Sequence, residues 1–241
     1  MERPLTRYIK PGSPSFDLKN YIQAGGYRGL LKALKEMKPG EVTNLVKASN
    51  LLGRGGAGFP TGVKWSLIPM NDENRTQKYL VCNADEMEPG TFKDRYLLEG
   101  NPHQLIEGMI ISAYAIQAEK AFIFLRWAYK KAEVNLRKAI GEAYEAGYLG
   151  KNILKSGFDI DLYVHSSAGR YICGEETALL NSLEGKRGIP RTKPPFPAIS
   201  GLFGNPTVVN NVETLSWIPH ILNNGADWFK SLSLTGTGGT K

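Results

Sequence analysis

Cysteine and histidine are scarce in this sequence, with two cysteines (Cys82 and Cys173) and three histidines in 241 residues. Two cysteines cannot build a disulfide framework or a cysteine-rich metal site, and a four-cysteine iron–sulfur cluster is impossible within this chain. The histidines lie far apart and show no metal-ligand spacing. We therefore expect no metal ion in this chain.

Long apolar runs are also missing. The first residues, MERPLTRYIKPGSP, contain no apolar segment of the kind found in a secretory signal. The most apolar stretch, MIISAYAI at 109–116, is too short to span a bilayer. No Ser/His/Asp arrangement or nucleophile elbow is apparent, so hydrolytic chemistry has little support. These absences predict a cytoplasmic protein without a hydrolytic site.

Positive charge is in excess, with 30 Lys and Arg against 23 Asp and Glu and a net charge of +7. Such an excess suggests an anionic partner: nucleic acid, nucleotide phosphates or an acidic neighbouring subunit. No long Lys/Arg run is present, which argues against a dedicated nucleic-acid surface.

Hydrophobic periodicity predicts three regions: an N-terminal arm and helices at 1–50, an α/β domain at 51–230 and a flexible tail at 231–241. Short β-rich runs at 79–82, 121–125 and 160–164 alternate with helices, one opening at Asn101-Pro102 and one stopping at Gly147. Strands spaced in this way imply a Rossmann-like parallel sheet flanked by helices. The N-terminal helical segment precedes it.

A glycine-rich loop, LLGRGGAGFPTG at 51–62, has five glycines between Gly53 and Gly62. Gly53, Gly55 and Gly58 fit the G-x-G-x-x-G dinucleotide fingerprint, which normally follows a strand and opens a helix. Here a helix end is expected before the loop, and Phe59-Pro60 is expected to block a helix directly after it. The glycines then serve to let the backbone approach a flat or phosphorylated ligand, unless the loop is a flexible connector.

Polar residues follow the predicted strands, where parallel sheets bind ligands. NADEMEPG at 83–90 carries three carboxylates and an amide, and Glu175 and Glu176 begin a helix. Val208–Thr214 should cap and begin another helix, with Asn210, Asn211 and Thr214 offering donors for a phosphate. The alternative for each segment is a solvated loop or an ordinary helix cap. Phe59, Trp65 and Phe196 could stack on ligand rings or belong to the core.

Four long motifs together resemble one family. They are GRGGAGFPTGVKWS at 53–66, CNADEMEPGTFKDR at 82–95, GRYICGEETALLNSLEGKRG at 169–188 and TKPPFPAISGLFGNPTVVNNVETL at 192–215. In this order they are similar to the NADH-binding FMN flavoprotein subunit of bacterial respiratory complex I, an NADH:quinone oxidoreductase, over its N-terminal part. Diaphorase subunits of NAD-linked hydrogenases and formate dehydrogenases share these stretches.

The resemblance implies an FMN-dependent NADH dehydrogenase module. Hydride would pass directly from NADH to FMN, so no catalytic side chain is expected. The residues implied for FMN are Gly53, Arg54, Gly55, Lys64, Asn83, Asp85, Glu86, Tyr171, Gly174, Glu175, Asn210, Asn211 and Thr214. Those implied for NADH are Gly56, Ala57, Gly58, Phe59, Glu88, Glu176, Lys193 and Phe196.

The resemblance also implies partners and a location. Single electrons would leave FMN for an iron–sulfur chain and finally quinone, within the peripheral arm of the complex. The small thioredoxin-like subunit with a 2Fe–2S cluster would be a direct neighbour, at the inner face of the cell membrane.

The sequence departs from this family in two places. Arg126-Trp127-Ala128-Tyr129 replaces the common R-G-E-Y, and Leu67 stands where some members place an aromatic on NADH. The family continues into a ubiquitin-like domain and a helical domain with the 4Fe–4S cysteine ligands, which this sequence lacks. Three functions therefore stay open: a complex I flavoprotein, a diaphorase subunit, and a truncated assembly fragment that binds no flavin.

Overall fold

The computed structural model describes residues 2–10, 12–70, 77–233 and 238–239. Four strands form one sheet: β1 (Tyr79–Ala84), β2 (Lys120–Leu125), β3 (Asp161–Ser166) and β4 (Thr207–Asn211). The helices are α1 (Leu18–Gln23), α2 (Arg28–Glu36), α3 (Pro39–Ala48), α4 (Thr61–Ser66), α5 (Lys93–Gly100), α6 (Pro102–Ile116), α7 (Lys130–Glu145), α8 (Glu176–Leu183), α9 (Val212–Asn224) and α10 (Ala226–Ser231). Short 3-10 turns η1 (Ile153–Lys155), η2 (Tyr171–Gly174) and η3 (Leu202–Gly204) join them.

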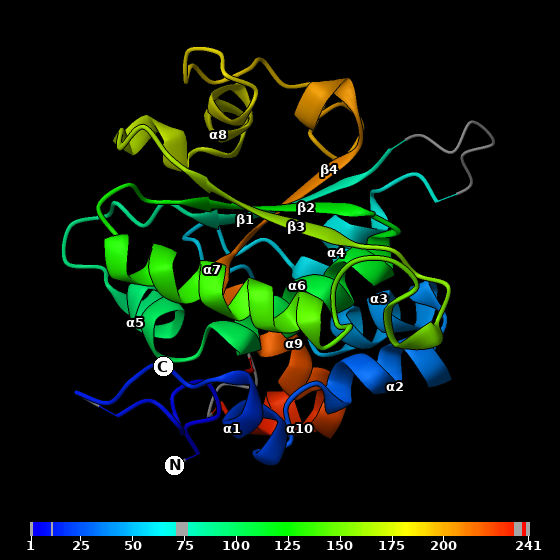
Figure 1. The fold of residues 1–241 in the computed structure, drawn as a ribbon. Coiled ribbons are helices and arrows are strands. Elements are labelled where there is room, and N and C mark those ends of the chain that lie inside the picture. The colour runs from blue at the N-terminus through cyan, green and yellow to red at the C-terminus, as the bar shows by residue number, and fades with distance from the viewer. Residues whose placement is uncertain (1, 11, 71–76, 234–237, 240–241) are drawn as a thin grey trace.

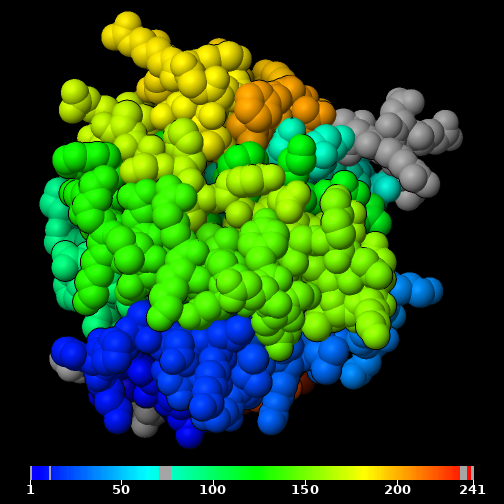
Figure 2. All heavy atoms as spheres, viewed as in Figure 1, coloured from blue at the N-terminus to red at the C-terminus, as the bar shows by residue number. Residues whose placement is uncertain are grey.

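The sheet has the order β3-β2-β1-β4, and every pairing in it is parallel. Helices α5, α6, α7 and α9 lie on one face of the sheet, and α8 lies on the other (Figure 1). Helices α1, α2 and α10 form a further layer outside α6 and α9. The space-filling view shows the N-terminal segment at one end of the molecule and the α8 region at the other (Figure 2). The predicted Rossmann-like parallel sheet is confirmed.

Alternation along β1 divides the core between the two faces of the sheet. Tyr79 and Val81 join the cluster that includes Leu179 of α8, whereas Leu80 and Cys82 join the larger cluster under α6 and α9. Successive side chains of a strand point to opposite faces, so one buried strand supplies both clusters. The two cysteines are buried and free.

Helices α6 and α9 cross unusually closely. A Cβ added at Gly108 would lie 2.0 Å from the backbone oxygen of Leu215. Pro219 stands four residues after Leu215 in α9 and has no N–H to donate to that oxygen, so the carbonyl is free to turn outward. The Leu215 carbonyl can approach α6 this closely because Gly108 has no side chain.

A buried carboxylate joins the outer helix layer to α6. Glu107 accepts hydrogen bonds from the Tyr21 hydroxyl (2.5 Å) and from the backbone nitrogens of Tyr27 (2.8 Å) and Leu30 (3.0 Å). Helix α2 begins at Arg28 and has no side-chain cap of its own. Glu107 therefore caps α2 from a different helix, satisfying amide groups that would otherwise be buried without partners. Burial raises the pKa of Glu107, and these donors partly oppose the rise.

Three expectations concern local structure near the loops and the C-terminus. The segment at 207–211 is a strand before α9 starts, whereas only the helix was predicted. Helix α4 begins at Thr61 directly after Pro60, so the expectation that Phe59-Pro60 blocks a helix was wrong. Of the predicted flexible tail, 234–237 and 240–241 lie outside the described residues, whereas the Gly239 nitrogen donates to the Phe229 oxygen at 3.0 Å.

The α6–α9 crossing predicts a large effect of one methyl group. Gly108→Ala should lower the free energy of unfolding by about 3 kcal/mol or more, because the new Cβ meets backbone that cannot move aside. Gly141→Ala is the matched control, since a Cβ added at Gly141 of α7 would meet no neighbouring segment within 4 Å. It should raise stability by roughly 0.5–1 kcal/mol. Urea unfolding followed by circular dichroism measures both, and equal midpoints for the two variants would contradict the packing argument.

Candidate functional site

The carboxyl ends of the four strands meet at one edge of the sheet. The chain runs from β1 to β2 and β3 on one side and then returns to place β4 on the other side of β1. Ligands of open α/β sheets bind beyond the strand ends where the strand order reverses. A cavity of about 400 Å³ lies there, which we name the strand-end cavity; it is lined by Arg54, Gly55, Gly56, Asn83, Asp85, Glu86, Met87, Glu88, Thr91, Lys93, Asp94, Tyr171, Gly174, Glu175 and Asn211.

The glycine loop forms one wall of this cavity. A bridge between Leu52 and Pro60 closes the loop at its base. Gly56 (φ 118°) and Gly58 (φ 65°) adopt left-handed conformations. A Cβ at Gly55 would stand 3.3 Å from the Cβ of Asn211, so loop and β4 approach closely. Glycine is thus required here for backbone shape and close packing, and the connector interpretation is not needed.

Asp85, at the end of β1, is the most informative acidic residue. It is 5% exposed, and its Oδ1 accepts a hydrogen bond from the Ser167 hydroxyl at 3.0 Å. Its Oδ2 is buried and has no hydrogen-bond partner among the described residues. Burial raises the pKa of Asp85, against the Ser167 hydrogen bond and the charge of Arg126, which lower it. A buried carboxylate oxygen without a donor is costly, so this atom is suited to a ligand hydroxyl.

Two neighbours of Asp85 have structural partners. The Asn83 amide donates to the Gly174 oxygen at 2.9 Å and so ties β1 to the turn before α8. Glu86 accepts from the backbone nitrogens of Asp94 (2.9 Å) and Arg95 (3.1 Å) and from the Tyr129 hydroxyl (2.9 Å). Although Glu86 lines the cavity, its carboxylate mainly caps the start of α5.

The N-terminus of α9 lies at the cavity, where its side chains hold the backbone of the helix and of the glycine loop in place. Asn211 caps the helix by accepting from the Glu213 nitrogen at 2.9 Å. Thr214 is fully buried, and its hydroxyl accepts from the Arg54 nitrogen at 2.9 Å. The Arg54 guanidinium in turn donates to the Gly238 oxygen at 2.9 Å. A helix N-terminus with a nearby arginine favours an anion.

Lys93 is a cavity residue that was not predicted. Its ammonium lies 2.7 Å from Asp94, 3.0 Å from Glu213 and 3.2 Å from the Asn211 oxygen. Burial would lower the pKa of Lys93, but the two carboxylates outweigh it and the pKa is raised. Lys93 and Asp94 fall within the second quoted motif, so that motif was the available signal; Met87 and Thr91 were missed with them.

A second group of charges lies at the start of α8. The Glu176 carboxylate forms ion pairs with the Lys64 ammonium at 2.7 Å and the Lys193 ammonium at 3.0 Å. Glu175 caps α8 through the nitrogens of Thr177 and Ala178, and Lys193 reaches it at 3.2 Å. Burial would raise the pKa of Glu176, yet the two lysines outweigh burial and its pKa is lowered. The pKa of Glu175 is also lowered, so both carboxylates are charged at neutral pH.

Glu88 stands apart from these paired carboxylates. Among the described residues its side chain has one hydrogen-bond partner, the Tyr171 hydroxyl, which donates to it at 2.7 Å. Tyr171 is 63% exposed, and the carboxylate raises the pKa of its hydroxyl. Glu88 thus presents a negative charge at the cavity rim that no cation of the described residues neutralises.

The aromatic residues and the asparagine pair divide between site and core. Trp65 is buried, and its indole nitrogen donates to the Asn210 oxygen at 2.9 Å. Asn210 therefore faces the core, and only Asn211 lines the cavity. Phe59 and Phe196 are 48% and 57% exposed, and both lie outside the residues that line the cavity.

The strand-end cavity gathers most of the residues implied for FMN and part of those implied for NADH. Beyond its lining lie Gly53, Lys64, Asn210 and Thr214 of the first set, and Ala57, Gly58, Phe59, Glu176, Lys193 and Phe196 of the second. Within the described part of the chain, no group of three His, Cys, Asp or Glu side chains could hold a metal ion. None of the described helices is long and apolar enough to cross a membrane.

Known proteins match the chain closely. The F subunit of the NADH-quinone oxidoreductase of Escherichia coli (strain K12) is 58% identical over 238 residues, which cover 99% of this chain and 53% of the relative. The F subunit of the Streptomyces coelicolor oxidoreductase is 57% identical over 218 residues, covering 90% and 48%. A crystal structure of an NAD+-reducing NiFe hydrogenase in the H2-reduced state aligns with a TM-score of 0.80 and 40% identity, covering 92% of this chain and 37% of that chain.

The chain spans about half the length of the curated relatives it matches. The family described as the Nuo51 FMN-binding domain matches residues 46–220, which include the glycine loop, all four strands and most of α9. The chain belongs to this FMN-binding family.

Proposed function

We propose that the chain binds FMN in the strand-end cavity and oxidises NADH with it, as the flavoprotein module of an NADH:quinone oxidoreductase. The observation that carries the proposal is the buried Asp85 Oδ2, which has no partner among the described residues and belongs to a side chain that lines a cavity with a glycine wall. The FMN-binding family and the names of the relatives support the same cofactor and substrate.

The residues of the cavity fit an FMN molecule in three respects. Asp85 offers an acceptor for a ribityl hydroxyl. Arg54 and the α9 N-terminus would contact the phosphate, with Thr214 at the same helix end, and Lys93 would reach it by exchanging its present contacts with Asp94 and Glu213. Gly55 and Gly56 leave the wall free of side chains, as a flat ring requires. The remaining implied FMN residues, including Lys64 and Asn210, lie outside this lining and would support the residues that form it.

NADH would lie across the glycine loop and the α8 side of the cavity. We assign Gly56–Phe59 and Phe196 to its rings and Lys193 to its phosphates. Glu88 and Glu176 would face its sugars, where carboxylates accept hydroxyl hydrogen bonds and repel a 2′-phosphate. Lys193 holds Glu175 and Glu176 in the present arrangement, so dinucleotide binding would exchange these ion pairs for contacts to phosphate.

The redox chemistry would be supplied by FMN, a cofactor able to take up a hydride and to release electrons singly. The contribution of the chain is to hold the two ring systems in contact and to exclude water, and no side-chain acid or nucleophile is required. In the assembled enzyme the electrons would continue through iron–sulfur clusters of other peripheral subunits, beginning with a small 2Fe–2S subunit, to quinone. The higher identity to the NADH-quinone oxidoreductase relative than to the hydrogenase, 58% against 40%, favours this over a diaphorase role.

A flavin titration tests the proposal. The purified chain should turn yellow with FMN and quench the fluorescence of the added FMN. Asp85→Asn should weaken FMN binding roughly tenfold, because a hydrogen bond to a charged group contributes about 1.5–3 kcal/mol. Asp227→Asn is the control, since Asp227 is fully exposed on α10. A wild-type chain that stays colourless in excess FMN would refute the proposal, and equal affinities of the two variants would refute the role of Asp85.

Selectivity for NADH over NADPH should depend on the two carboxylates facing the dinucleotide. Glu88→Gln removes an uncompensated charge and should raise the rate with NADPH relative to NADH. Glu176→Gln should act in the same direction and more strongly, because it also frees Lys64 and Lys193. Anaerobic bleaching of bound FMN by each dinucleotide gives the two rates.

Tyr171→Phe controls for the selectivity experiment, because it removes the hydroxyl that contacts Glu88 and keeps the carboxylate charge. This variant should retain the wild-type preference. If Glu88→Gln and Tyr171→Phe give the same ratio of rates, the carboxylate charge does not exclude NADPH.

A further inference from the structure

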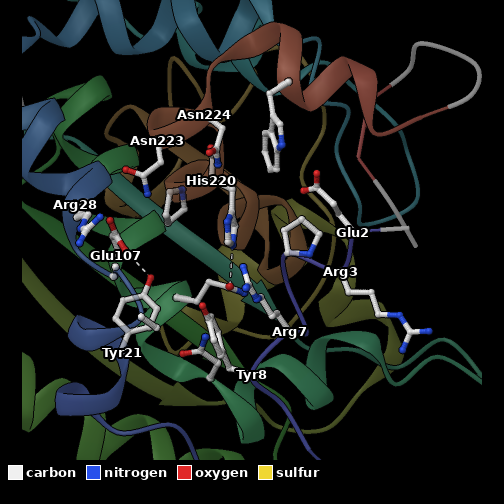
Figure 3. Close-up of a pocket in the computed structure, with 18 residues that line it drawn as sticks. Glu2, Arg3, Arg7, Tyr8, Tyr21, Arg28, Glu107, His220, Asn223 and Asn224 are labelled. Carbon is white, nitrogen blue, oxygen red and sulfur yellow. Dashed lines mark hydrogen bonds between the residues drawn. The ribbon is translucent and has the colours of Figure 1, made fainter.

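A second and larger cavity lies beyond the helices that back the sheet. It has a volume of about 1060 Å³ and lies between the N-terminal arm (residues 2–8), the turn between α1 and α2, the first turns of α6, and the end of α9 with α10 (Figure 3). We name it the arm cavity. No residue assigned to FMN or NADH lines it, so it is separate from the strand-end cavity.

The charge of the arm cavity is mainly positive. Arg3, Arg7 and Arg28 line it, and in the part of the chain that the structure describes none of them forms an ion pair. Of its two carboxylates, Glu2 lies on the arm, and the oxygens of Glu107 are already bound by Tyr21 and by backbone nitrogens of α2.

His220 adds no charge to the cavity at neutral pH. Burial lowers its pKa to about 4, and its Nε2 lies 2.9 Å from the Gln104 oxygen. Among the described residues, the lining of the arm cavity therefore has three guanidinium groups without ion pairs and one carboxylate, that of Glu2, without the structural hydrogen bonds that Glu107 makes. Arginine in such surroundings binds phosphate or carboxylate groups through paired N–H donors.

The start of α6 provides an independent sign of a missing partner. Asn101 occupies the N-cap position of this 15-residue helix, but its side chain makes no capping hydrogen bond. Asn101 is 2% exposed, and its Oδ1 is buried without a hydrogen-bond partner in the described part of the chain. The first turn of α6 carries no acidic residue, so the positive end of the helix is not neutralised locally. The site is thus polar, cationic and incompletely satisfied.

The placement of the arginines indicates the size of the ligand. In the close-up, Arg7 lies near His220, Arg28 lies on the opposite side beside Glu107, and Arg3 extends away from both (Figure 3). Arg7 and Arg28 come from different segments, so one ligand would need more than one anionic group to reach both. Tyr8 and Trp228 provide aromatic surface in the same lining, and the volume far exceeds that of inorganic phosphate.

We propose that the arm cavity binds a nucleoside polyphosphate, with Arg7 and Arg28 on the phosphates and Tyr8 or Trp228 against the base. This ligand differs from the dinucleotide at the strand-end cavity in position and in contacts. Helices α6 and α9 line the arm cavity and also back the sheet, so an occupant would contact the helices that carry the other site.

Isothermal titration calorimetry of the 241-residue chain with ATP, with and without excess NAD+, measures the affinity for ATP and tests the proposal. ATP should bind in both conditions. Arg7→Met and Arg28→Met should each weaken binding at least roughly tenfold, since each removes a charge-assisted contact to phosphate. Arg137→Met is the control, because Arg137 lies on α7, outside the cavity and paired with Glu133, and it should bind as the wild type does.

The other outcomes also decide the question. Absence of ATP binding, displacement of ATP by NAD+, or unchanged binding by both arginine variants would overturn the proposal. Inorganic tripolyphosphate should bind more weakly than ATP, and equal affinity would overturn the assignment of a nucleoside. Arg7 lies on the N-terminal arm, where its guanidinium is 5.5 Å from the centre of the Tyr8 ring. Arg7→Met therefore changes no helix of the fold, and it keeps the test valid if Arg28→Met fails to fold.

Discussion

The contact between Gly108 and the Leu215 carbonyl is the constraint on which both ends of the molecule depend. It seats α9 against α6 at a separation that any side chain at position 108 would prevent. Asn211, the N-cap residue of α9, lines the strand-end cavity, and the last turn of α9 lines the arm cavity. A helix packed this rigidly behaves as one body, so its position fixes donors at both sites at once. Proline frees the Leu215 carbonyl, and glycine leaves room for it, so no side chain is needed at the crossing point.

The strand-end cavity combines charges that are already paired with charges that are not. Beside the cavity, Lys64 and Lys193 pair with Glu175 and Glu176, and in its lining Lys93 is shared between two carboxylates. Among the described residues, Asp85 and Glu88 lack such partners. Pairing stabilises a polar cleft before the ligand arrives, whereas the unpaired groups are those from which a ligand gains net interaction energy.

The sheet could be predicted because local patterns carry it, and the residues that line the strand-end cavity all fall within the four motifs of the family resemblance. Strand runs, the helix start at Asn101-Pro102 and polar residues after strands are visible within a few positions of one another, although the Asn101 side chain makes no capping hydrogen bond. What could not be predicted depends on partners far away in sequence. Strand β4 was missed because its five residues merge with the α9 start, and strand alternation sends Asn210 to Trp65 and only Asn211 to the cavity. The hydrogen bond from the Tyr27 backbone nitrogen to the Glu107 carboxylate likewise joins residues 80 positions apart in the sequence.

The place of β4 in the sheet has a consequence for synthesis. This strand is the last of the four to be made, yet it pairs with β1, far earlier in the chain. Until β4 emerges from the ribosome, β1 has an unpaired edge, and the cavity lacks Asn211 and the α9 N-terminus. A nascent chain ending before residue 207 would therefore have its first three strands and its glycine loop but no complete strand-end cavity. Any ligand of that cavity would have to wait for β4, and the exposed β1 edge is then the point at which chaperones or misfolding would compete with β4.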